Sequence, residues 1–201
     1  MAGGTGAFDA RTGTRKWLLD ATFPHVLAAS DGSIYATGDL NSVVPEQIAA
    51  YRLTDGTLLW LTQSTAEPYR GLGTDGRFVY AANNGGVEAF SISDCAAHPN
   101  CSHAWVSLVS GRSSSPSVSN GVLYAVHIDT DSQDPSTNHG LLDAIDINTG
   151  QRLLRKVYGP DVEMDQPVVA NGSLLFTTRQ VGADGAAHDT IHKLAVPNSS
   201  P

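Results

Sequence analysis

The chain has 201 residues, of which 12 are Lys or Arg and 20 are Asp or Glu, so its formal net charge is −8. This acidic balance, without any Lys/Arg run, argues against a nucleic acid or an anionic membrane as the partner. No apolar run reaches the roughly 18 to 20 residues of a transmembrane helix, and the first residues lack the basic and apolar regions of a signal peptide. The 20 glycines, with only 16% charged residues, favour many short strands joined by turns.

One strand-turn-strand pattern begins near the start of the chain. Ala7 and Trp17 stand at its two ends, and Asp9, Thr12 and Gly13 lie between them. The glycine supplies the positive φ that a tight turn requires. The later copies hold these equivalent residues: Ala50, Gly56 and Trp60; Ala89 and Trp105, six residues late; and Ala144, Asp146, Thr149 and Gly150, with Leu154 in the tryptophan position. Four copies of one pattern indicate a repeat protein.

A second signal recurs between these units. Asp-Gly or Asn-Gly turns place glycines at 32, 76, 121 and 172, and each turn is followed by an aromatic-bearing strand. The spacings of 44, 45 and 51 match a four-stranded propeller blade of roughly 40 to 50 residues. We therefore predict an all-β fold, a β-propeller segment of four-stranded antiparallel blades in an incomplete ring. The expected segment is 1–195, with blades at 6–20 (partial), 24–62, 68–109, 115–158 and 166–195 (partial), loop insertions that include residues 94–102, and a tail at 196–201.

The unit at residues 7–17 resembles the tryptophan-docking motif of the pyrroloquinoline-quinone-like (quinoprotein-type) propeller repeats. It agrees with the pattern Ala-x-Asp-x-x-Thr-Gly-x-x-x-Trp at every defined position. The later copies depart from it, since Arg52 and Asp55 replace the aspartate and the threonine, Ser91 replaces the aspartate, and Leu154 replaces the tryptophan. The resemblance covers about residues 6–195 and implies the fold more strongly than any function.

The three tryptophans are predicted to be structural. A large ring on an outer strand can pack against the neighbouring blade, burying roughly 150 to 250 Å² and holding the blades in register. We therefore expect Trp17, Trp60 and Trp105 to form joints between blades. Leu154 should leave a weaker joint.

Cys95 and Cys101 are the two cysteines of the chain. Their spacing closes a short loop, and a disulfide is the expected state in an exported protein. Zinc is the alternative, because His98 and His103 lie close by in the sequence. The resemblance adds that two cysteines bracket the corresponding loop in secreted bacterial members of this repeat class.

Asp129, Asp131 and Asp134 cluster on an expected loop. Their carboxylates are hard oxygen ligands that suit calcium, but the loop lacks the glycine and the distal glutamate of an EF-hand. A solvated acidic loop is the simpler interpretation. Residues 71–76 also match G-x-G-x-x-G, but a strand follows this stretch in place of the helix that a phosphate site needs, so it is interpreted as turn chemistry.

No catalytic, cofactor-binding or metal-binding residue is assigned from the sequence. The leading hypothesis is a non-catalytic binding or scaffolding module of an extracellular, cell-surface or periplasmic protein. Its expected partners are a protein or surface polymer, and either further blades of a longer chain or a second copy. The resemblance also allows a fragment of a quinone-dependent dehydrogenase, in which case the quinone and calcium would be cofactors, or a scaffold that helps insert outer-membrane barrels.

Overall fold

The computed structural model describes residues 6–18, 26–38, 47–63, 69–98, 100–108, 111–129, 139–160, 162–182 and 185–196. Strands make up 65% of these residues and helix 4%. The strands in chain order are β1 (Gly6–Phe8), β2 (Arg15–Leu18), β3 (Val26–Ser30), β4 (Ser33–Gly38), β5 (Gln47–Arg52), β6 (Leu58–Leu61), β7 (Gly71–Thr74), β8 (Phe78–Ala82), β9 (Gly86–Ser91), β10 (Trp105–Leu108), β11 (Arg112–Ser113), β12 (Ser117–Ser119), β13 (Val122–Asp129), β14 (His139–Asp146), β15 (Arg152–Pro160), β16 (Val162–Met164), β17 (Val168–Ala170), β18 (Ser173–Val181) and β19 (Ala187–Ala195).

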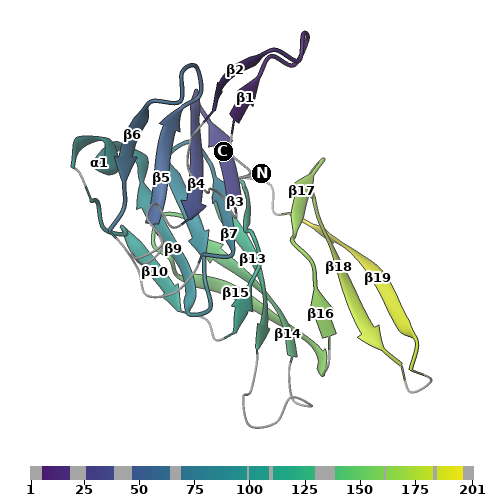
Figure 1. Ribbon diagram of the computed structural model, residues 1–201. Helices are drawn as coiled ribbons and strands as arrows, with labels where there is room; N and C mark the ends of the chain where they lie inside the picture. Colours follow the sequence, from purple (N-terminus) through teal and green to yellow (C-terminus); the bar gives the residue numbers. More distant parts are fainter. Residues whose placement is uncertain are drawn as a thin grey trace.

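The strands form five separate antiparallel sheets (Figure 1). β1 and β2 form a two-stranded first sheet, β3 to β6 the second, β7 to β10 the third, β11 to β15 the fourth, and β16 to β19 the fifth. Within each of the last two sheets the innermost position is shared by two short strands, β11 with β12 and β16 with β17. The all-β propeller architecture is thus confirmed, and among the described residues the sheets do not close a ring.

Two local features differ from the sequence-based expectation. Residues 92–97, placed partly at the start of a loop insertion, form the helix α1 (Ile92–Ala97). The helix begins because the Ser91 hydroxyl accepts a hydrogen bond from the Asp94 backbone N–H at 3.3 Å, which caps its first turn. Val196, which was assigned to the tail, is instead buried, and its N–H donates to the Gly172 carbonyl. The rest of the predicted tail, 197–201, lies outside the described residues.

The hydrophobic core is divided among the spaces between adjacent sheets. One cluster joins the second and third sheets around Tyr35, Trp60 and Phe90. A second cluster joins the third and fourth sheets, and a third joins the fourth and fifth. The second to fifth sheets therefore bury apolar side chains against one another, as expected when a single sheet cannot bury its apolar face alone.

The inner strands approach one another closely because glycine lies at the contact. A Cβ placed on Gly71 would lie 2.2 Å from the Ser115 Cα, and one on Gly73 would lie 2.6 Å from the Pro116 carbonyl oxygen. The stretch that matches G-x-G-x-x-G is accordingly the inner strand β7 and the turn after it, with the strand β8 following. The glycines serve packing between sheets at this point.

Replacing Gly71 with alanine should destabilise the protein by about 2 to 3 kcal/mol, because the methyl group would overlap the Ser115 backbone. Gly159 is the matched control, since it lies in β15 and a Cβ there would meet no atom within 4 Å. Gly159→Ala should leave stability unchanged or raise it slightly. Urea unfolding monitored by circular dichroism measures both. Equal midpoints for the two variants would contradict the close-packing account.

Candidate functional site

Two of the predicted tryptophan joints share the same geometry. The Trp17 indole Nε1 donates to the Leu53 carbonyl at 2.8 Å, and its ring packs on Gly56, whose added Cβ would lie 3.0 Å away. Trp105 repeats this contact in its own joint, where Nε1 donates at 2.9 Å to the carbonyl of Ile147, which lies 42 residues further along the chain. Each indole therefore links the outer strand of one sheet to the outer turn of the next sheet.

The turns of this type are built by the motif residues, and the one in the fourth sheet receives the Trp105 indole. In the first turn, the Asp9 carboxylate accepts hydrogen bonds from the backbone N–H groups of Arg11 and Thr12, and the Gly13 N–H donates to the Asp9 carbonyl. These bonds lower the pKa of Asp9 below its ordinary value, with the Thr12 N–H as the largest cause. Asp146, Thr149 and Gly150 repeat the arrangement.

The turn in the second sheet has the same shape, although two of its motif residues are replaced. Arg52 stands where the other copies have aspartate, and its guanidinium bonds to the Asp55 carboxylate at 3.1 Å. The Asp55 carboxylate also accepts the Thr57 N–H at 2.9 Å, while the Gly56 N–H still donates to the Arg52 carbonyl. The departure from the motif therefore preserves the turn.

Gly150 provides a test of indole docking. Gly150 and Gly121 have similar positive φ values of 71° and 77°, so alanine strains the backbone at both positions. At Gly150 alone of this pair the methyl group would also meet the Trp105 ring, at 2.6 Å. Gly150→Ala should therefore cost about 1 to 3 kcal/mol more than Gly121→Ala in urea unfolding. Similar losses would mean that the indole contributes little at this joint.

Trp60 forms its joint with a different structure. The third sheet has the helix α1 and a disulfide between Cys95 and Cys101 in place of the glycine turn. Both sulfur-bearing residues are buried and belong to the same hydrophobic cluster as Trp60. An isolated parallel bridge pairs Thr62 with Cys101, so the disulfide loop is joined to the end of β6. The zinc alternative is wrong, because the disulfide leaves no thiolate to bind a metal.

We call this region the disulfide corner, defined by β6, α1 and the Cys95–Cys101 loop. Two hollows flank α1, of about 380 Å³ and 240 Å³. The smaller one lies between β6 and the loop, and its lining is mostly apolar: Leu58, Leu59, Trp60, Leu61, Cys95, Ala96 and Asn100. Leu58 and Leu59 are 46% and 40% exposed, so the corner presents apolar side chains to solvent.

A buried polar row crosses the fourth sheet, and no motif in the sequence predicts it. The Ser113 hydroxyl lies 2.6 Å from His127 Nδ1, and the Asp143 carboxylate accepts two hydrogen bonds from Arg155 at 2.8 and 2.7 Å. These side chains come from β11, β13, β14 and β15, so only strand register reveals that they meet.

The row contains a serine, a histidine and an aspartate, but its geometry is not that of a nucleophilic triad. The distance from His127 Nε2 to the Asp143 carboxylate is 3.6 Å, beyond hydrogen-bonding range, and Ser113 is 5% exposed. Ser113 is therefore almost fully removed from solvent. The row instead holds the strands of the sheet together.

The row makes stability depend on pH. Burial lowers the pKa of His127 to about 4, and the attraction of Asp143 offsets this only in part, so the ring is neutral when folded. The unfolded chain takes up a proton near pH 6.5, so stability should fall as pH drops from about 6.5 toward 4, by about 2 kcal/mol between pH 7.5 and pH 5. Urea unfolding across this range measures the slope. His127→Gln should remove that part of the slope, whereas the exposed control His98→Gln should retain it.

The calcium hypothesis rests on residues that the structure describes only in part. Asp129 ends β13, whereas Asp131 and Asp134 lie outside the described residues. Within the described ranges, no three His, Cys, Asp or Glu side chains gather in a way that could hold a metal ion. The calcium-and-quinone alternative stays a prediction, because two of its three candidate carboxylates lie outside the described residues. The described part of the chain also holds no helix long and apolar enough to span a membrane.

Comparison with known proteins supports the fold. No protein-family model and no curated protein matches the chain. Among solved structures, the computationally designed Ika4 protein aligns with a TM-score of 0.62 at 13% identity, covering 89% of this chain and 94% of Ika4. The designed Ika8 protein gives 0.65 at 14%, covering 92% and 51%, and BamB from Moraxella catarrhalis gives 0.58 at 13%, covering 97% and 59%. This chain thus spans little more than half of Ika8 or BamB, and the likeness defines a propeller module.

Proposed function

We propose that this chain is a non-catalytic propeller module of PQQ-like repeats that binds a protein partner through the disulfide corner. The observation that carries the proposal is the pair of exposed leucines, Leu58 and Leu59, beside the 240 Å³ hollow. Exposed apolar side chains around a hollow are typical of surfaces that bind other proteins. The corner is also the joint at which this chain replaces its usual glycine turn.

The edge of β6 adds a second means of recognition. β6 is the last strand of its sheet, so one of its sides pairs with no strand of that sheet. An extended partner segment could add to this edge through main-chain hydrogen bonds while its alternate side chains enter the apolar hollow. The disulfide would keep the hollow in shape by fixing α1 against β6.

We place the module outside the cytoplasm, in an extracellular, cell-surface or periplasmic setting. The Cys95–Cys101 disulfide supports this, because such bonds persist in oxidising compartments. The dehydrogenase alternative is not preferred, because no residue of the sequence can be matched to the calcium ligands or the catalytic aspartate of that family. The scaffold role in barrel insertion rests on likeness of fold alone and is not preferred.

Site-specific photocrosslinking tests the proposal. A photoreactive residue at position 58 should give a discrete crosslinked protein in the native extracytoplasmic fraction, and Leu59→Asp should reduce the yield at least several-fold. The matched control is the same photoreactive residue at Ile191, which is 77% exposed on the fifth sheet and should give no such product.

Two results would contradict this function. Equal crosslinking from positions 58 and 191 would mean that the corner is not a specific surface. Stoichiometric binding of the quinone with calcium, accompanied by reduction of a dye, would instead support the dehydrogenase alternative.

A further inference from the structure

The four joints place one outer-strand residue at the same register. Trp17, Trp60, Trp105 and Leu154 are the cross-strand partners of Ala7, Ala50, Ala89 and Ala144, respectively. Leu154 therefore occupies the indole position of the joint between the fourth and fifth sheets, and it is 59% exposed.

The surroundings of Trp105 show what this position normally holds. The ring lies 5.9 Å from the Tyr80 ring of its own sheet, centroid to centroid, and packs in one cluster with Leu123 and Ile145 of the next sheet. Its N–H donates to the Ile147 carbonyl. An aromatic neighbour, an apolar wall and one carbonyl thus define the indole site.

The next joint repeats the aromatic neighbour, the apolar wall and the carbonyl without the indole, whereas the counterpart of Gly150 falls outside the described residues. Strand register gives the equivalents of Tyr80, Leu123 and Ile145 as Tyr124, Leu174 and Leu194. Val196 is the equivalent of Ile147, because the N–H of each donates to the carbonyl of its turn glycine. A hollow of about 210 Å³ lies at this joint, and its lining is as follows: Val122, Tyr124, Leu142, Ala144, Leu153, Leu154, Leu174, Leu194 and Ala195.

The size of this hollow suits it to a small ligand, and one hydroxyl sets it apart from the preceding joint. Its volume exceeds the roughly 150 Å³ of an engineered apolar cavity that takes up benzene. The Tyr124 hydroxyl is buried and makes no hydrogen bond to any described residue, whereas the equivalent Tyr80 hydroxyl donates to Asp75 at 3.1 Å. This hydroxyl distinguishes the two joints, and the ligand proposed below does not depend on bonding to it.

We propose that the hollow at the joint between the fourth and fifth sheets binds a small planar aromatic molecule with an N–H donor, of the size of indole. The ligand takes the position that Trp105 fills in the preceding joint, with its ring beside Tyr124 and its N–H directed to the Val196 carbonyl. This site lies apart from the disulfide corner, and it does not depend on the function proposed above.

Titration with 5-fluoroindole, followed by ¹⁹F NMR, tests the proposal, and indole itself serves as the competitor. The expected result is saturable binding at one site with a Kd of roughly 0.1 to 1 mM, as befits a ligand of so few atoms. Indene has the same shape but lacks the N–H, and it should compete about 2- to 10-fold more weakly than indole. Absence of saturable binding would overturn the proposal.

Leu154→Trp provides the decisive variant, because its own indole should fill the hollow. It should abolish binding and raise Tm by roughly 2 to 4 °C. Leu108→Trp is the matched control, since it adds the same residue to an outer strand at a position that is 78% exposed, and it should change neither quantity. If Leu154→Trp fails to fold, Leu154→Phe takes its place in the test. Phenylalanine fills the hollow only in part, so this variant should weaken binding. Unchanged binding in a folded Leu154→Trp or Leu154→Phe protein would overturn the assignment of the site.

Discussion

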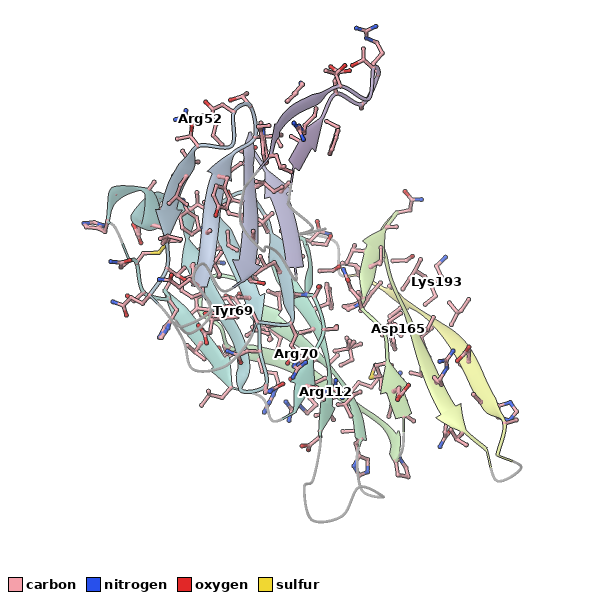
Figure 2. All side chains as sticks on the ribbon, viewed as in Figure 1. Arg52, Tyr69, Arg70, Arg112, Asp165 and Lys193 are labelled. Atoms are coloured by element: carbon pink, nitrogen blue, oxygen red, sulfur yellow. A yellow bond between two sulfur atoms is a disulfide. The ribbon has the colours of Figure 1, made fainter. Side chains whose placement is uncertain are left out.

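The contact between an indole and the outer turn of the next sheet is the interaction on which this architecture depends. Trp17 and Trp105 each pack on a glycine and donate one hydrogen bond to a main-chain carbonyl, so the contact is both apolar and directional. Burying a ring of roughly 200 Å² contributes about 5 kcal/mol before entropy is counted. Neighbouring sheets are thereby fixed in angle as well as in distance, and the inner strands can approach through Gly71 and Gly73. Figure 2 shows side chains extending from the strands into the spaces between the sheets.

Much of the fold could be predicted from the sequence because local patterns that repeat along the chain determine it. Asp-Gly and Asn-Gly turns depend on backbone conformation at two residues, and the observed hairpins lie where those turns occur. The disulfide between Cys95 and Cys101 spans a short loop and could likewise be predicted from the sequence. These features require no knowledge of which strand lies beside which.

The features that sequence analysis missed depend on contacts between distant residues or on weak local preferences. The row from Ser113 to Arg155 exists only because strand register aligns four strands, and a lone histidine in a strand carries no such information. The helix α1 has six residues, too few for a recognisable apolar period. The hollow beside Leu154 is a property of the joint, although the missing tryptophan itself was visible as a departure from the repeat.

The joints differ in stability, and this difference determines the order in which the sheets unfold. In a linear array of repeats, stability is approximately the sum of the units and the interfaces between neighbours, so cooperativity fails first at the poorest interface. The fifth sheet meets the rest through the joint that has leucine in place of tryptophan. Its outer strand β19 is mostly exposed and pairs with β18 alone in that sheet. Partial opening should therefore release the fifth sheet as one foldon while the second, third and fourth remain a single cooperative body.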